Sequence, residues 1–256
     1  MTDFELQILS APLGKTWLFY AGQAGYIIKS KTGQIMAIDV YFTECGERIE
    51  NTVGFKRLLP KLLNPANNLY DYIVATHPHF DHFDIDAMPI LLSNQGVTLV
   101  ASVDCEQEIK KMGIHNPNIF YKKPGEELSI GDYCINFTEC DHGLLAPDAF
   151  GVVITVDGKK IYMTGDTCKR MDRVRYINSL GPFDIIIGPI NGAYGNMNEE
   201  DYSEFASAIN ANKVIPCHYG LFAQHGGNPG EFLRIMNEKH EEKRVYLMAV
   251  GEKFEL

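Results

Sequence analysis

The order in which strand-like and helix-like segments follow one another is the feature that most constrains the fold of this chain. The first half opens with three strand-like runs, 16–20, 25–28 and 35–39, separated by short breaks that contain glycine, as is typical of an antiparallel meander. Strands and helices then alternate, and the second half repeats this order. Two mixed sheets packed face to face, with helices outside, would satisfy both halves, so the expected fold class is an α/β sandwich.

The alternating part of each half supplies the remaining expected elements. After the meander we expect strands at 72–76 and 97–101 and helices at 55–63, 85–92 and 104–112. In the second half we expect strands at 134–137, 151–156, 160–163, 184–187, 213–216 and 244–248, helices at 171–178, 199–210 and 230–238, and a short tail at 253–256. Neither a low-complexity linker nor a block of like charges divides the chain, which predicts a single domain, residues 1–256.

Composition and charge narrow the classes of function. The 256 residues are 45% apolar and 22% charged, an ordinary globular composition, and the formal net charge of −10 argues against a general binder of nucleic acid or anionic membranes. The N-terminus lacks the features of a signal peptide, and no apolar run approaches the roughly 18 residues of a membrane-spanning helix. The six cysteines form no CxxC pair, and most are expected to be buried. We therefore expect a cytoplasmic protein that acts on a small molecule.

A cluster of metal-binding side chains directly follows the strand-like run 72–76. It consists of His77, His79, Asp81 and His82, and it holds three of the eight histidines of the chain. In a loop at the end of a strand, side chains two residues apart can converge on one side, and imidazole and carboxylate groups are suitable ligands for zinc, manganese or iron. A single histidine would favour an ordinary polar loop, whereas this density favours a metal site.

Three further candidate ligands stand at or beyond the ends of expected strands: His142, Asp166 and His218. Asp166 follows Gly165, and a glycine before the acid suits a tight turn. Taken alone, each histidine would more often be a satisfied core or surface residue, and Asp166 an ordinary turn aspartate. A site with two metal ions needs more ligands than the first loop supplies. The order of these three residues after the first cluster makes them candidates for the missing ligands.

These residues give the chain a resemblance to the metallo-β-lactamase superfamily, whose signature is HxHxDH followed by single histidine, aspartate and histidine ligands. The resemblance spans nearly the whole chain. Within the superfamily the chain is similar to the L-ascorbate 6-phosphate lactonase-like proteins at Val74–His77, Ile161–Thr167 and Val250–Glu252. It is also similar to the small uncharacterised metal-dependent hydrolases of the superfamily, at Gly165–Thr167 and Pro216–Tyr219.

The resemblance implies the metallo-β-lactamase fold, a four-layer αββα sandwich of two mixed sheets, and two divalent metal ions, zinc or manganese. It assigns His77, His79 and His142 to the first metal, Asp81, His82 and His218 to the second, and Asp166 to a bridge between them. It also implies that Asp39, at the end of a strand, supports the metal loop, although Val40 follows it where many members have proline. The lactonase-like proteins tend to form oligomers, so a homo-oligomer is expected.

The implied chemistry is hydrolysis. Two cations about 3.5–4 Å apart can share a water and lower its pKa toward neutrality, and the resulting hydroxide would attack a carbonyl carbon or a phosphorus atom. Asp81 and Asp166 would orient that hydroxide. The expected substrate is a small ester or lactone, and the resemblance places a sugar-acid phosphate lactone first. The alternatives are a phosphodiesterase and a non-catalytic metabolite sensor, whereas the diiron oxygen-reducing proteins of this fold carry HxExD and this chain has His79.

Residues outside the metal set leave the substrate contacts open. His225 and Tyr194 each lie in a glycine-rich loop after an expected strand, and each could touch substrate or be an ordinary loop residue. Lys56 and Arg57 could bind a phosphate on the substrate, although a solvated helix face explains such a pair more often.

Overall fold

The computed structural model describes residues 1–144 and 146–256, and these residues form two compact units. Unit 1 comprises residues 1–123, 221–224 and 249–256, and unit 2 comprises residues 124–220 and 225–248. Within the described residues each unit contains one mixed β-sheet, with seven strands in unit 1 and six in unit 2. The prediction of two mixed sheets is therefore confirmed, and the assignment of the whole chain to one domain stays a prediction.

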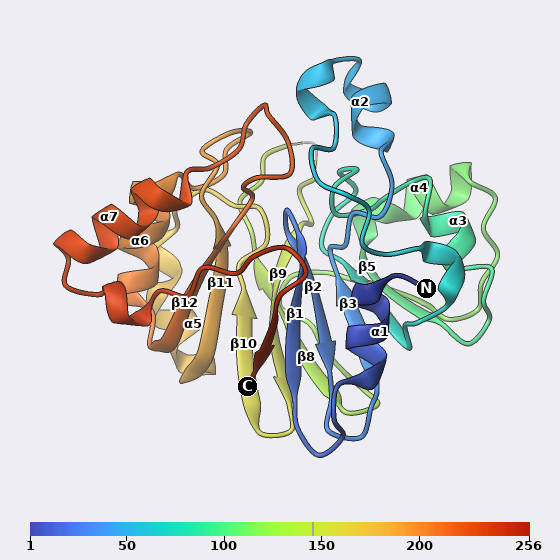
Figure 1. The fold of residues 1–256 in the computed structure, drawn as a ribbon, viewed down its shortest axis with the longest axis horizontal. Coiled ribbons are helices and arrows are strands. Elements are labelled where there is room, and N and C mark those ends of the chain that lie inside the picture. The colour runs from blue at the N-terminus through green and yellow to red at the C-terminus, as the bar shows by residue number, and fades with distance from the viewer. Residues whose placement is uncertain (145) are drawn as a thin grey trace. The chain divides into compact units, whose positions relative to one another are not determined.

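The sheet of unit 1 has the strand order β13-β1-β2-β3-β4-β5-β6, and Figure 1 labels β1, β2, β3 and β5 of this sheet. Its strands are β1 (Trp17–Gly22), β2 (Gly25–Lys29), β3 (Ile35–Ile38), β4 (Tyr72–Ala75), β5 (Thr98–Ser102), β6 (Ile119–Lys122) and β13 (Lys253–Glu255). The strands from β13 to β3 pair in antiparallel fashion, whereas those from β3 to β6 are parallel. As a result, the carboxyl ends of β3 and β4 lie at the same edge of the sheet as the turn between β1 and β2.

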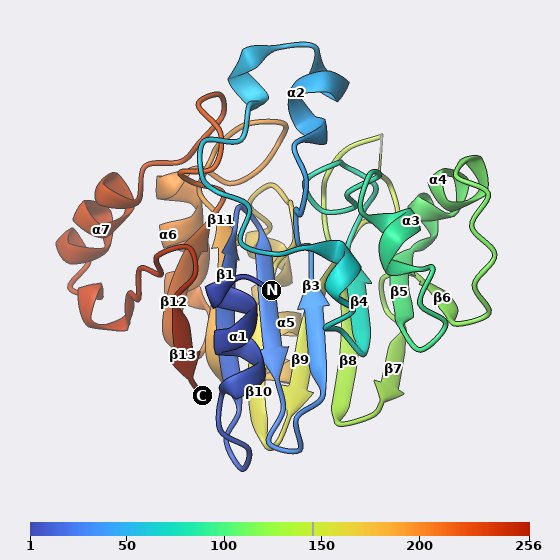
Figure 2. The same cartoon turned by 45° about the vertical axis from the view of Figure 1, so that its right-hand side comes forward.

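The helices of unit 1 are α1 (Asp3–Ser10), α2 (Cys45–Glu50), α3 (Met88–Leu91) and α4 (Glu106–Lys111), with 3₁₀ turns η1 (Val53–Phe55), η2 (Pro65–Asn67) and η3 (Val103–Cys105). Helix α1 begins at a capping box formed by Thr2 and Glu5. Its Phe4 and Ile8 side chains belong to the same core as the residues of β1–β3, along which α1 lies in Figure 2. The buried Lys29 ends the helix, because its ammonium group donates to backbone carbonyls in and just after the last turn.

The sheet of unit 2 has the order β12-β11-β10-β9-β8-β7. Its strands are β7 (Glu127–Ile130), β8 (Tyr133–Glu139), β9 (Phe150–Val156), β10 (Lys159–Met163), β11 (Phe183–Pro189) and β12 (Ala211–Cys217). Strands β10–β12 are parallel and β7–β10 antiparallel, so the carboxyl ends of β8, β10, β11 and β12 share one edge. The helices are α5 (Val174–Leu180), α6 (Glu199–Ala208) and α7 (Pro229–Glu238), with 3₁₀ turns η4 (Met171–Arg173) and η5 (Glu242–Arg244).

The predicted helix at 55–63 is wrong. Only the 3₁₀ turn η1 touches this range, and the rest is extended or irregular. The segment takes its backbone partners from a distant part of unit 1: the Leu58 N–H donates to the Leu221 carbonyl at 2.9 Å, and the Gln224 N–H donates to the Gly54 carbonyl at 3.0 Å. These long-range bonds replace the i to i−4 bonds of a helix, which Pro60 already disfavours.

Other differences from the sequence-based expectation are smaller. The predicted strand at 244–248 is wrong, since Val245 makes only an isolated bridge to Val214. The tail at 253–256 contains strand β13, which pairs with β1. The helix predicted at 85–92 shortens to α3, and α1, α2, β6 and β7 were not predicted.

The structure bears on two further expectations, the burial of the cysteines and the lack of a membrane-spanning helix. Cys45, Cys105 and Cys217 are buried, whereas the other three cysteines are half-buried or exposed, so the expectation that most are buried is only half right. In the part of the chain that the structure describes, no helix has the length and apolar character needed to cross a membrane.

The buried Tyr202 on α6 predicts a loss of stability at high pH. Its hydroxyl donates to the carbonyls of Ile186 and Ile215, both at 3.1 Å, and burial raises the pKa of its phenol well above the ordinary value of 10.0. Above that ordinary value the unfolded state loses a proton that the folded state keeps, so the free energy of unfolding falls as pH rises. Tyr202→Phe should cost about 1 kcal/mol at neutral pH and make the alkaline decline shallower.

Urea unfolding between about pH 8 and pH 11 measures this effect. Tyr176→Phe is the control, because Tyr176 is 46% exposed. The same alkaline slope in the wild type and in Tyr202→Phe would contradict the prediction.

Candidate metal site

Asp39, which follows β3, holds the loop that follows β4. Its Oδ1 accepts from the Thr76 N–H at 2.8 Å, and its Oδ2 accepts from the Thr76 hydroxyl at 2.7 Å and lies 2.9 Å from His82 Nδ1. All three residues are buried. Because β3 and β4 are parallel neighbours, the loops at their carboxyl ends meet. With Nδ1 of His82 donating to the carboxylate, its Nε2 presents a lone pair that can bind a metal.

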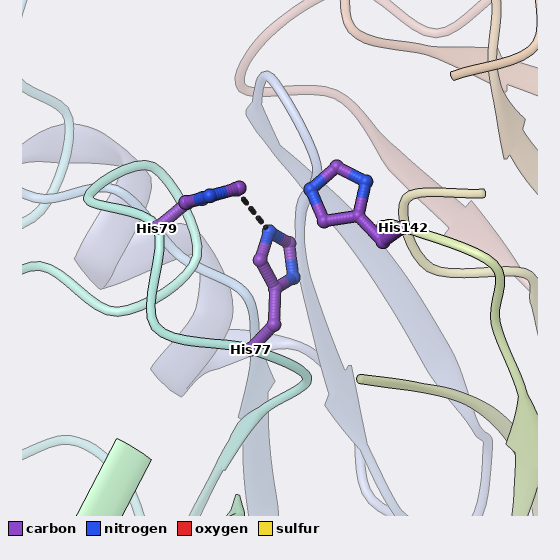
Figure 3. A group of neighbouring side chains, drawn as sticks. All are labelled: His77, His79 and His142. Atoms are coloured by element: carbon purple, nitrogen blue, oxygen red, sulfur yellow. Dashed lines mark hydrogen bonds between the residues drawn. The ribbon is translucent and has the colours of Figure 1, made fainter. Parts of the chain in front are cut away.

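Thr76 orients His77 in the same way. The Thr76 hydroxyl donates its hydrogen bond to Asp39 Oδ2, so its oxygen accepts one from His77 Nδ1, which is 3.1 Å away. Nε2 of His77 then faces Nδ1 of His79 at 2.9 Å, a contact drawn as a dashed line in Figure 3. Tetrahedral zinc with Zn–N distances of about 2.05 Å brings neighbouring ligand nitrogens to about 3.3 Å. The two ring nitrogens are therefore spaced much as ligands of one cation would be.

Two acidic residues of the same loop have separate partners. Asp81 Oδ2 accepts from the side-chain amide of Gln23 at 3.0 Å and lies 3.9 Å from His82 Nε2. Asp84 is fully buried, and its two oxygens accept hydrogen bonds from backbone N–H groups on both sides of the loop. Neither Gln23 nor Asp84 was predicted from the sequence.

Unit 2 contributes the other three predicted ligands. His142, Asp166 and His218 follow β8, β10 and β12, whose carboxyl ends share one edge of the sheet, and all three are buried. His218 Nε2 lies 3.0 Å from Asp166 Oδ1, again a spacing close to that of two ligands on one cation. Figure 3 draws the ring of His142, on the loop after β8.

Asp166 is oriented by Asn196, a residue that the sequence did not single out. Asn196 Nδ2 donates to Asp166 Oδ2 at 2.7 Å and to Asn191 Oδ1 at 3.2 Å. Asn196 lies in the glycine-rich loop after β11, which is tied to the turn after β10 by a bond from the Met197 N–H to the Thr167 carbonyl at 2.9 Å. The glycine-rich composition was visible in the sequence, but the contact with Asp166 was not.

Of the nine non-glycine residues with positive φ in the described part of the chain, five are a predicted ligand, a hydrogen-bond partner of one, or a predicted substrate contact. Gln23, Asp39, Tyr194, His218 and His225 have φ values of 56°, 50°, 54°, 62° and 56°. Residues with a Cβ adopt such angles at an energetic cost, and they cluster at functional sites, where the surrounding structure holds them in place. The backbone at these positions is therefore constrained in a way that packing of an ordinary loop does not require.

The predicted substrate contacts have different outcomes. Tyr194 and His225 meet in unit 2, with ring centroids 4.9 Å apart in an edge-to-face arrangement, and Tyr194 is 60% exposed. Arg57 is buried, and its guanidinium donates to backbone carbonyls of unit 1. Lys56 is exposed. Lys56 and Arg57 therefore do not lie on a solvated helix face, and the Arg57 guanidinium is hydrogen-bonded to the backbone.

Comparison with known proteins assigns the chain to a family. The family model described as "Beta-lactamase superfamily domain" matches residues 43–219. The chain belongs to the metallo-β-lactamase superfamily. A UPF0173 metal-dependent hydrolase of Methanosphaera stadtmanae is 32% identical over 218 residues, which cover 79% of this chain and 83% of that protein. A second UPF0173 metal-dependent hydrolase, of Rubrobacter xylanophilus, is 28% identical over 251 residues, which cover 94% and 96%. The chain is a member of this UPF0173 family.

The solved structures agree on the fold. Igni18, a metallo hydrolase from Ignicoccus hospitalis, has a TM-score of 0.73 and 23% identity, and the match covers 94% of this chain and 98% of that one. The predicted fold class, the αββα sandwich of the metallo-β-lactamase superfamily, is confirmed. The residues that belong to candidate metal-binding groups include all seven predicted ligands: His77, His79, Asp81, His82, His142, Asp166 and His218.

Proposed function

We propose that the two ligand sets complete one dinuclear metal centre, with which the chain hydrolyses a small ester or lactone. Three histidines would hold one zinc or manganese ion, a carboxylate and two histidines would hold the other, and a second carboxylate would be shared by both. The first ion would bind His77, His79 and His142, the second would bind Asp81, His82 and His218, and the shared carboxylate is Asp166. The name metal-dependent hydrolase, carried by the relatives from M. stadtmanae and R. xylanophilus, supports this activity.

The observation that carries the proposal is the fixed orientation of the ligand atoms. Asp39 accepts a hydrogen bond from His82 Nδ1, and the Thr76 hydroxyl, which donates to Asp39, accepts one from His77 Nδ1. Both imidazoles thereby present Nε2, in the neutral form that binds a cation. Asp39 is thus the residue that supports the metal loop, and Val40 in place of proline leaves its contacts intact. A merely polar loop would have no need for ring orientations fixed from a neighbouring strand.

The side chains around the centre have distinct roles in the proposed reaction. Two bound divalent cations would supply a water of lowered pKa and positive charge for the substrate oxygen. In this proposal Asp81 and Asp166 would orient that water and accept its proton. The phenol of Tyr194 and the imidazole of His225 are polar groups that can bind oxygen atoms of the substrate.

We place a substrate with a carbonyl group, such as an ester or lactone, ahead of a phosphodiester. The preference comes from the likeness to the lactonase-like proteins in the segments around Thr76, Asp166 and Gly251. A clamp for a phosphodiester made by Lys56 and Arg57 is disfavoured, because the Arg57 guanidinium is buried against backbone carbonyls. A sugar-acid phosphate lactone is the first compound to test within the lactone class.

The test combines metal content with turnover. Mass spectrometry of the purified protein should find about two equivalents of zinc or manganese, and a lactone should be hydrolysed in a reaction that a chelator stops and added metal restores. Turnover of bis(4-nitrophenyl) phosphate without lactone turnover would favour a phosphodiesterase instead. Tight binding of one metabolite without turnover would favour a sensor, and no bound metal under metal-replete conditions would overturn the proposal.

A further inference from the structure

Each of the two proposed catalytic carboxylates accepts a hydrogen bond from a neutral side-chain amide in its own unit. In unit 1 the amide is Gln23, which donates to Asp81 Oδ2 at 3.0 Å. In unit 2 it is Asn196, which donates to Asp166 Oδ2 at 2.7 Å. Gln23 and Asn196 are only 5% and 7% exposed. Because burial of an amide is costly unless it is hydrogen-bonded, each amide is held on its carboxylate.

The backbone around Gln23 is shaped to aim this side chain at the metal loop. Gln23 lies in the turn between β1 and β2 with φ of 56°, and its carbonyl accepts from the Tyr20 hydroxyl at 3.1 Å. Gly25 lets the turn come close to the end of β3, since a Cβ there would lie 3.0 Å from Val40 Cα and 3.2 Å from the Asp39 carbonyl oxygen. The turn that carries Gln23 therefore packs against Asp39, which itself holds the metal loop.

The loop of Asn196 serves the second carboxylate in a comparable way. The Asn196 N–H donates to the Ala193 carbonyl at 2.9 Å and closes a tight turn. Gly192, at φ of 61°, passes so close to Asn198 that a Cβ would lie 2.9 Å from the Cβ of that residue. The glycines of this loop thus allow the compact path that brings the amide onto Asp166. The nitrogen of the amide faces Asp166, because an ionised carboxylate only accepts hydrogen bonds.

A neutral amide orients a carboxylate without neutralising it. Lysine or arginine in the same place would form an ion pair and reduce the negative charge that a divalent cation requires. One donated hydrogen bond uses only one of the roughly four acceptor positions that a carboxylate has. An amide is therefore the donor type that fixes a side-chain rotamer at a metal centre with the least loss of ligand strength.

We propose that Gln23 and Asn196 are a matched pair of positioning residues, which hold Asp81 and Asp166 in the orientation that coordinates the cations and receives a proton. This assignment rests on the proposed dinuclear centre. Since neither amide acts on the substrate directly, their loss should lower metal affinity and kcat and leave KM nearly unchanged.

Substitutions that replace the amide donor or draw it back from the carboxylate test the proposal. Q23E and N196D each put a second carboxylate against the first, and Q23N keeps the amide and suits a left-handed backbone but withdraws the donor by one methylene. We expect each variant to bind zinc more weakly, in competition with a chromogenic chelator, and to lose kcat by about 10–100-fold. The visible spectrum of the cobalt-loaded protein should change as well, because the ligand geometry changes.

The matched controls are Q107E and N237D, which make the same chemical changes at exposed positions of α4 and α7. Melting temperatures of all five variants show whether folding is preserved. The proposal is overturned if Q23E, Q23N and N196D bind zinc, turn over substrate and absorb as the controls do, or if the loss lies in KM. Absence of metal from the wild type would overturn the dinuclear centre as well, whereas normal metal binding by wild type and variants alike overturns only the role of the amides.

Discussion

Alanine in place of His79 is expected to remove both bound metal and hydrolytic activity. His79 Nδ1 lies 2.9 Å from His77 Nε2, so the substitution takes one member from the pair of nitrogens that face each other on the loop after β4. Loss of a residue that merely hydrogen-bonds a ligand costs about 10–100-fold in metal affinity, and loss of the ligand itself should cost more. Asp166→Ala should have an effect at least as large, because this carboxylate is proposed to touch both cations.

Metal content by mass spectrometry and lactone turnover, measured on the same preparations, check this prediction. His115→Ala is the control, because His115 is an exposed histidine outside both ligand sets. The double variant His79→Ala/Asp166→Ala should resemble either single variant in activity, since residues that act as one unit are not additive. Full activity of that double variant without metal would show that the reaction does not use the metal centre.

The metal ligands of unit 1 could be predicted from the sequence because they are local. His77, His79, Asp81 and His82 lie on one loop, and a short motif records them completely. The residues that orient them do not lie on that loop. Gln23 is 58 residues away from Asp81, and an isolated glutamine next to a glycine carries no local signal. Asp39 was identified only through the resemblance to a family, since its contact with Thr76 spans 37 residues.

The errors in the predicted secondary structure also come from long-range contacts, which leave no local signal in the sequence. The apolar residues around Phe55 suggested a helix, but the Phe55 ring packs against Phe80 and Phe222 in an aromatic cluster, and the backbone follows that packing. At the other end of the chain, Arg244 binds the carbonyl oxygens of Ala206 and Ile209 at the end of α6, at 3.2 and 3.0 Å, instead of beginning a strand. In both places tertiary contacts outweigh the local pattern of the sequence.

By contrast, the start of α1 carries a local signal in the sequence, although no helix was predicted there. Thr2 followed three residues later by Glu5 is the sequence signature of a capping box, and both of its hydrogen bonds form. A similar local signal accompanies Asp84, whose Oδ1 accepts from the N–H groups of Asp86 and Ala87 at 3.1 Å each, just before α3. The local contacts of Asp84, with Asp86 and Ala87, could therefore be predicted from the sequence, whereas its long-range contacts could not.

Those long-range contacts of Asp84 predict a large loss of stability when its carboxylate is removed. Its Oδ2 accepts from the N–H groups of Phe42 and Thr43, at 2.9 and 2.7 Å, and its Oδ1 accepts from the Thr43 hydroxyl at 2.8 Å. The side chain is fully buried, so these donors have no water to replace it. One carboxylate thus ties the segment after β3 to the end of the metal loop.

Asp84→Ala should lower the free energy of unfolding by about 3–5 kcal/mol, because several buried N–H groups each lose an acceptor at about 1–3 kcal/mol. Asp84→Asn should be intermediate, since its amide nitrogen cannot accept the hydrogen bonds on one side. Urea unfolding at neutral pH measures both changes. Asp86→Ala is the control: its carboxylate forms an exposed ion pair with Arg48 at 2.7 Å, and such pairs contribute about 0–1 kcal/mol. A loss in Asp84→Ala no larger than that of the control would mean that the loop after β4 is held by its remaining contacts, with Asp39 foremost among them.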